Sequence, residues 1–173
     1  MRKNEHTKKI ALLSLCVSVA LMFSYLEMQI PPLFPSVPGI KMGLANIAVI
    51  FVLYRFGVKA AAAVSLVRLL IMMLLFGHMM MFFYSLAGAF LSLLSMALLK
   101  KADFLSEVGI SVAGGIFHNL GQVILAVILL NTTEIGYYMI VLSVTGTVSG
   151  ILVGLCSAFL LKRLPQTAIT GGK

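Results

Sequence analysis

Charged residues are scarce in this sequence: 10% of the residues are Asp, Glu, Lys or Arg, whereas 61% are apolar. A typical soluble domain is about 25% charged and about 45–50% apolar. A 173-residue globule cannot bury this apolar excess, because a small fold leaves much of its surface in water. The composition therefore excludes an ordinary soluble domain and predicts a protein that exposes apolar surface to lipid.

The sequence also lacks the alternation of apolar and polar residues that the strands of a membrane barrel show. It contains long apolar runs instead, such as 10–26 and 60–76. Every backbone polar group inside lipid must bond within the protein, so only helices and closed barrels can cross a bilayer. We therefore predict an all-α membrane protein that forms one domain over residues 1–173.

Residues and motifs for catalysis are few. The two cysteines, Cys16 and Cys156, lie inside apolar runs with no Cys/His cluster, which excludes the usual disulfide and metal patterns. The single aspartate, Asp103, cannot build an Asp-rich site for magnesium and a diphosphate. The sequence has no P-loop, HExxH or GxSxG motif. We expect no catalytic residue, no metal and no cofactor, and hence no enzyme activity in this chain.

The apolar pattern predicts six transmembrane helices, each of which needs about 17–25 residues to span the bilayer. The first segment is longer than the apolar part of a signal peptide and ends in Glu27, so we interpret it as a retained helix. A proline-rich stretch at 28–40 separates it from a short second segment. The expected helices cover residues 10–27, 41–56, 60–76, 79–99, 108–130 and 137–161.

The cations indicate the orientation of these helices. Cytoplasmic loops are enriched in Lys and Arg, and four basic clusters all fall on one side of a six-helix chain. The formal charge of +8 is therefore a topology signal and not a sign of nucleic-acid binding. We expect a multi-pass protein of the cell membrane with both termini in the cytoplasm. The clusters are Arg2, Lys3, Lys8 and Lys9, then Arg55 and Lys59, then Lys100 and Lys101, and finally Lys162 and Arg163.

Two cations do not follow this pattern. Arg68 lies eight residues into its helix, which places it about 12 Å deep. A charge at that depth costs several kcal/mol, so it is either part of a ligand site or part of a structural ion pair. Lys41 opens the second helix on the outer side, where Lys41, Gly43 and Asn46 would suit an anion at a helix start. An interfacial Lys with a packing Gly and Asn is the alternative.

Three further polar residues lie at membrane depth. Glu27 is the only acid near the outer end of the first helix and could pair with Lys41 or Arg68, or bind a ligand. His118 and Asn119 lie in the fifth helix, where they could contact a ligand or hold helices together.

One polar cavity in the outer half of the membrane would explain these residues together. Its cations outnumber its acid, and desolvated cations favour an anionic ligand through charge-assisted hydrogen bonds. The guanidinium of Arg68 offers a planar fork that suits a carboxylate or a phosphate. The predicted ligand-binding residues are Glu27, Lys41, Asn46, Arg68, His118 and Asn119.

Small residues at four-residue spacing let helices pack closely. The sixth helix carries Gly146, Gly150 and Gly154 at this spacing, and we interpret the stripe as packing inside the bundle. The first helix carries Cys16, Ala20 and Ser24, with Ser14 and Ser18 close by. This second stripe could instead face a partner subunit.

Four segments together resemble a known family: Lys41–Asn46, Arg68, Ser85–Ala89 and Gly115–Gln122. In order and spacing they look like the Gx transporter family, which is often labelled heptaprenyl diphosphate synthase component I. That family is similar to the S-components of energy-coupling-factor transporters. The resemblance covers roughly residues 8–163.

The resemblance implies a six-helix protein that binds a vitamin or precursor on the outer side of the membrane. S-components work with a transmembrane scaffold subunit and two cytosolic ATPases, and their first helix meets the scaffold through small residues. Residues Cys16, Ala20 and Ser24 match that spacing, although Cys and Ser replace the commoner Ala. Two other functions stay open, namely a non-catalytic membrane accessory of heptaprenyl diphosphate or quinone synthesis and a stand-alone secondary transporter.

The predicted topology can be tested by cysteine labelling of intact cells. A cysteine at Thr132 should react with an impermeant reagent from outside, because it follows the fifth helix on the side with few cations. A cysteine at Ala102 should not react, because it lies in a basic loop. The reverse pattern, or labelling at both positions, would contradict the six-helix topology.

Overall fold

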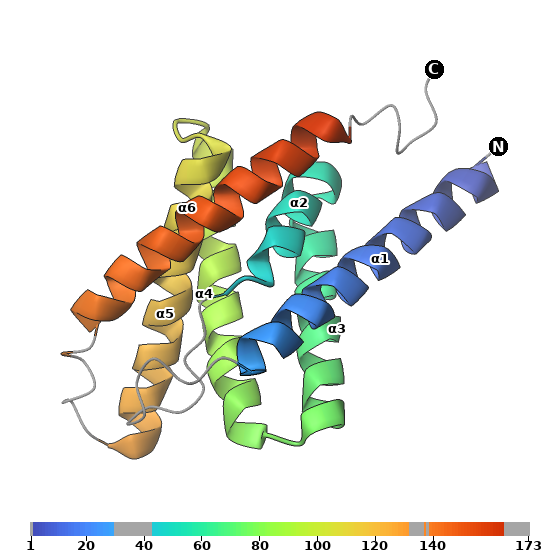
Figure 1. Cartoon of the computed structure of the whole chain (residues 1–173). Coiled ribbons are helices and arrows are strands. Elements are labelled where there is room, and N and C mark those ends of the chain that lie inside the picture. Colours follow the sequence, from blue (N-terminus) through green and yellow to red (C-terminus); the bar gives the residue numbers. More distant parts are fainter. Residues whose placement is uncertain (1, 30–42, 132–136, 138, 165–173) are drawn as a thin grey trace.

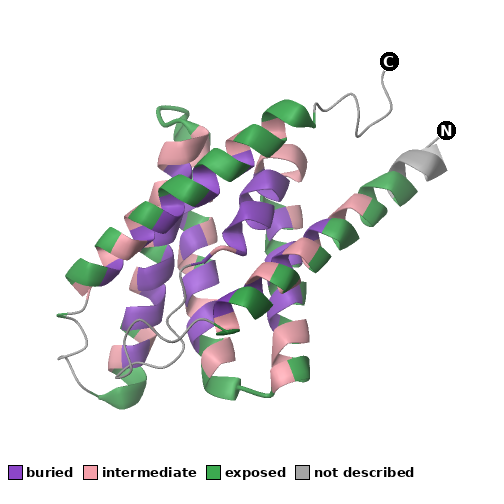
Figure 2. Ribbon diagram, in the orientation of Figure 1, coloured by how far each residue is buried: buried purple, intermediate pink, exposed green. Residues whose placement is uncertain are grey.

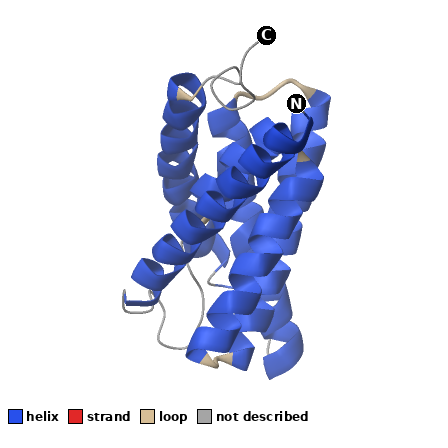
Figure 3. Ribbon diagram, turned by 90° about the vertical axis from the view of Figure 1, so that its right-hand side faces the viewer, coloured by secondary structure: helices blue, strands red, loops and turns tan. Residues whose placement is uncertain are grey.

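The computed structural model describes residues 2–29, 43–131, 137 and 139–164, with side chains from Thr7 onward. Within these residues the regular secondary structure is helical and contains no strand, which confirms the all-α prediction (Figures 1 and 3). The helices are α1 (Arg2–Gln29), α2 (Asn46–Phe56), α3 (Val58–Phe76), α4 (Met79–Ala102), α5 (Glu107–Leu130) and α6 (Met139–Arg163).

Five of these helices are long and apolar enough to cross a membrane, whereas α2 is not. The 11 residues of α2 span about 16 Å, roughly half of a hydrocarbon core of about 30 Å. We expected a helix over 41–56, but α2 begins at Asn46, so the count of six spans is not confirmed. The reason is the turn before it, in which Gly43 has a φ of +84° and the amide of Asn46 donates to the Gly43 carbonyl at 2.9 Å.

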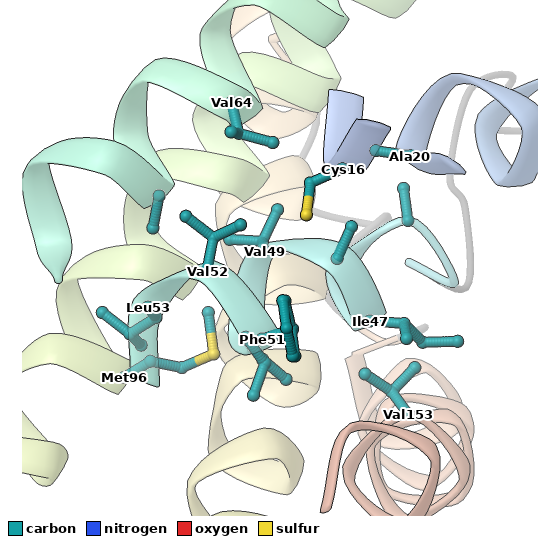
Figure 4. Packing of buried hydrophobic residues seen from close by; sticks show 14 of the residues in the cluster. Cys16, Ala20, Ile47, Val49, Phe51, Val52, Leu53, Val64, Met96 and Val153 are labelled. Atoms are coloured by element: carbon teal, nitrogen blue, oxygen red, sulfur yellow. The ribbon is translucent and has the colours of Figure 1, made fainter. Parts of the chain in front are cut away.

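The short helix α2 forms the centre of the bundle. All eight residues from Asn46 to Leu53 are buried, and Figure 2 shows this helix almost wholly in the buried class. A helix that is apolar on every side must be enclosed by other elements. Its side chains pack against Ala20 of α1, Val64 of α3, Met96 of α4 and Val153 of α6 (Figure 4). The longer helices therefore shield α2 from lipid.

Glycines bring α5 and α6 into backbone contact. A Cβ atom on Gly115 would lie 2.4 Å from the carbonyl oxygen of Gly146, and one on Gly150 would lie 2.6 Å from the Cα of Val112. Gly154 meets Val108 in the same way. The predicted role of the Gly146–Gly150–Gly154 stripe in packing is thus confirmed, and we call this contact the glycine seam.

Cations join the helix ends at one end of the bundle. Arg55, at the end of α2, donates hydrogen bonds to the carbonyl of Leu161 in α6 and to that of Leu164, which directly follows α6. Lys100, at the end of α4, donates to the carbonyl of Leu53 at 2.8 Å. The start of α1 and the end of α6 lie at this same end in Figure 1. The basic clusters that predict a cytoplasmic side therefore gather on one side of the fold.

The glycine seam predicts a sharp difference between two similar substitutions. Gly115→Ala should destabilise the protein by about 1–3 kcal/mol, because the new methyl group meets backbone that cannot move aside. Gly109→Ala is the matched control in the same helix, since its Cβ would lie no closer than 3.5 Å to any atom. Thermal unfolding of the detergent-solubilised variants measures both, and equal unfolding midpoints would show that the seam is not tightly packed.

Candidate functional site

The side chain of Arg68, in α3, is buried against α1, and its solvent-exposed fraction is 6%. Its Nη1 donates to the hydroxyl of Ser24 in α1 at 2.8 Å. Its charge also interacts with the carboxylate of Glu27, one turn further along α1. The Arg68 Nε and Nη2 atoms have no hydrogen-bond partner among the described residues. One edge of the guanidinium is therefore held by α1, and the other edge is left without an acceptor.

Glu27 connects this arginine to the start of α2. Its Oε1 accepts a hydrogen bond from the backbone amide of Leu44 at 2.8 Å. A negative charge is favourable beside the amide groups at a helix start, and here the chain supplies its own carboxylate. The anion position that we expected at 41–46 is thus occupied in part by Glu27. Lys41, the other predicted member of that segment, lies outside the described residues.

Asn46 and His118 meet around Gly43. A Cβ atom on Gly43 would lie 3.0 Å from Asn46 Nδ2 and 3.8 Å from His118 Cδ2. On its other side His118 packs against Gly88 of α4, where a Cβ would lie 2.9 Å from the imidazole Cε1. Glycine is required at residue 43 both by this close approach and by its positive φ. The structure thus places Asn46 of α2 and His118 of α5 close together around this glycine.

Asn119 lies apart from these groups. Its Nδ2 donates to the carbonyl of Leu142 in α6 at 2.7 Å, and the same atom lies beside Gly146. The Asn119 side chain therefore belongs to the glycine seam, where it joins two helices. This contact matches the alternative role that we gave it from the sequence, a polar bond between helices.

The stripe predicted to meet a partner lies inside this chain. Cys16, Ala20 and Ser24 are all buried, and Figure 4 shows Cys16 and Ala20 within the core around α2. The exposed face of α1 carries Ser14 and Ser18 instead, with the Ser18 hydroxyl bonded only to the local Ser14 carbonyl in the described contacts. The sequence spacing was correct for close packing, but the close neighbours belong to the same chain.

A small pocket opens beside Arg68, between α1, α3 and α4. Most of its lining is apolar, and methionine is the commonest residue. The sequence analysis expected a cavity beside Arg68 but named no methionine in its walls. The signal was present in α3, where Leu69, Met72, Met73 and Phe76 follow the spacing of one helix face. The lining residues are Ser24, Met28, Arg68, Leu69, Met72, Met73, Phe76, His78, Met81, Phe82 and Ser85.

The acids, cysteines and histidines are spread through the fold. Among the residues that the structure describes, no three of them come together in a way that could hold a metal ion. The chemistry available beside the pocket is that of one guanidinium, two hydroxyl groups and an imidazole against apolar walls. This set can bind and orient a ligand.

Comparison with known protein families gives a match over most of the chain. A family model described as heptaprenyl diphosphate synthase component I matches residues 16–160. No curated protein and no solved structure matches the sequence. The matched stretch carries the label of the family that the sequence resembles, which confirms that prediction, and it contains Glu27, Arg68 and the whole pocket lining.

Proposed function

The chain belongs to the heptaprenyl diphosphate synthase component I family, and from this premise we propose that it is a non-catalytic membrane subunit that captures a small anionic metabolite for uptake. The single observation that carries the proposal is the buried guanidinium of Arg68 at the wall of a pocket. We place the α3–α4 turn on the outer side of the membrane, so that the pocket receives its ligand from outside.

The contacts of Arg68 favour a ligand over a purely structural role. An ionisable group at membrane depth is costly, and a structural arginine offsets that cost by bonding all of its donors. Here Nη1 bonds Ser24, whereas the Nε and Nη2 donors are unbonded among the described residues. The Nε and Nη2 hydrogens form the parallel pair that binds a carboxylate or a phosphate in a bidentate manner. An anion would complete this site.

The energy for uptake has to come from elsewhere, because the sequence carries no nucleotide-binding P-loop. We propose a transmembrane scaffold subunit and two cytosolic ATPases as partners, by analogy with the S-components that the sequence resembles. The exposed face of α1 around Ser14 and Ser18 is the surface that we assign to the scaffold. These residues are small enough for a second helix to approach closely.

A second candidate function is a membrane accessory of heptaprenyl diphosphate synthesis. The observation in its favour is the name of the family. In that case the chain would associate with a prenyl synthase and not with ATPases. Co-purification from native membranes separates the two functions, because it identifies the partner directly.

The proposed site predicts a loss of affinity in Arg68→Lys. Lysine keeps the charge but lacks the planar donor pair, so ligand binding should weaken tenfold or more, about 1.4 kcal/mol, with expression intact. Native mass spectrometry of the purified protein identifies the retained ligand, and titration of that ligand measures the affinity. Arg163→Lys at the exposed end of α6 is the matched control and should bind normally.

Two results would contradict the site. Near-normal ligand binding by Arg68→Lys would reject bidentate recognition by the guanidinium. Loss of folded protein in both Arg68→Lys and Glu27→Gln would show that the two residues form a structural ion pair. The site would then shrink to Asn46 and His118.

The assigned docking face predicts opposite behaviour of two leucine substitutions in α1. Ser18→Leu should abolish co-purification of the scaffold and ATPases while the isolated chain unfolds at its normal temperature, because Ser18 is exposed. Ala20→Leu should lower the unfolding temperature of the isolated chain, because Ala20 is 0% exposed. An intact complex in Ser18→Leu would move the interface to another face.

A further inference from the structure

The apolar lining of the pocket beside Arg68 restricts the class of ligand more than the charge of Arg68 does. We infer that this pocket takes an amphipathic monoanion, namely one carboxylate attached to an apolar chain or ring. The inference rests on the proposed function, and it narrows the ligand from any small anion to this class. It follows from the lining, from the position of Arg68 along the pocket and from the number of charges.

The walls of the pocket are suited to an apolar body. Leu69, Met72, Met73 and Phe76 line it from α3, while Met81 and Phe82 line it from α4, and Met28 closes it from α1. Methionine side chains are flexible and polarisable, so they adapt to irregular apolar shapes. A purely hydrophilic anion, such as inorganic phosphate, would leave this surface in contact with trapped water and gain nothing from it.

The cation and an aromatic residue line the pocket from the same helix, α3. Arg68 precedes Phe76 by eight residues of continuous helix, which corresponds to about 12 Å. The ring of Phe76 stacks on Tyr25 of α1, with centroids 5.6 Å apart, and Tyr25 follows Ser24, which Arg68 contacts. A ligand bound to Arg68 through its head would therefore place its apolar part against the side chains of α3 and α4 that line the pocket.

The charges near Arg68 limit the charge of the head. Among the described residues, Arg68 is the only Lys or Arg that lines this pocket, and the carboxylate of Glu27 already interacts with it. A diphosphate would bring two or more negative charges beside one arginine, the single Lys or Arg in the described lining. Burying charges without partners is strongly unfavourable. A single carboxylate matches the free Nε and Nη2 donors with one acceptor for each.

Three probes separate the two parts of the inference. Hexanoate has both the carboxylate and the apolar chain, hexanamide has the same shape without the charge, and inorganic phosphate has the charge without the chain. Binding is measured by equilibrium dialysis of the full chain in lipid nanodiscs, with empty nanodiscs subtracted. We expect hexanoate to bind at least tenfold more tightly than hexanamide and at least tenfold more tightly than phosphate. In Arg68→Gln the advantage of hexanoate over hexanamide should disappear.

Polar substitutions in the lining provide a second test that does not depend on the fold of Arg68 variants. Met72→Gln and Met81→Gln should each weaken hexanoate binding at least fivefold and leave phosphate binding unchanged. Met79→Gln is the matched control, because Met79 is 53% exposed and lies outside the lining. It should bind hexanoate as the unaltered chain does.

The possible outcomes distinguish this inference from the proposed function. Tighter binding of phosphate than of hexanoate, with dependence on Arg68, overturns the amphipathic ligand but supports capture of an anion. Equal binding of hexanoate and hexanamide, or no binding of hexanoate, overturns the inference. If no probe distinguishes the unaltered chain from Arg68→Gln, the anion site itself is rejected, and the proposed function fails with it.

Discussion

The hydrogen bond from the Leu44 amide to the Glu27 carboxylate satisfies a backbone group in the irregular segment that precedes α2, and the rest of the fold depends on this bond. The helix α2 begins part of the way through the bundle, and an irregular backbone at membrane depth is tolerated only where protein or a polar cavity satisfies it. The bond brings a carboxylate inside, and that carboxylate is compensated by Arg68. The same requirement keeps the longer helices around α2, because a short helix start in contact with lipid would expose unbonded amides.

The bundle combines two kinds of helix contact. On one side, the glycine seam brings the backbones of α5 and α6 together, so this part of the fold has little freedom to change its spacing. On the other side, α1, α3 and α4 meet through long side chains such as Met72 and Phe82, which can move without shifting the backbone. The pocket lies in this second region. A ligand can therefore be accommodated by side-chain movement while the seam keeps the overall architecture.

Sequence patterns predicted the features that depend on composition and period. Long apolar runs give the five helices that are long and apolar enough to cross a membrane, and the cost of a buried charge indicated that Arg68 needs a partner, for which Glu27 was one candidate. The start of α2 could not be predicted, because the turn at Gly43 depends on Glu27, which lies far away along the chain. The roles of Asn119 and of the stripe formed by Cys16, Ala20 and Ser24 were ambiguous for another reason. Helical spacing shows which residues share a face, but it does not show which helix that face meets.

The cations that bond helix carbonyls have a consequence for how this protein can change during evolution. Arg55 and Lys100 belong to the clusters that predict the orientation of the chain, and they also fasten the end of α2 to α6 and to α4. A mutation that removed either charge would weaken the charge pattern that sets the orientation, and it would also remove the hydrogen bonds that hold α2 to a neighbouring helix. The same two cations therefore serve both the membrane orientation and the folding of the chain. Mutations that would let the chain insert in both orientations would also destabilise the fold.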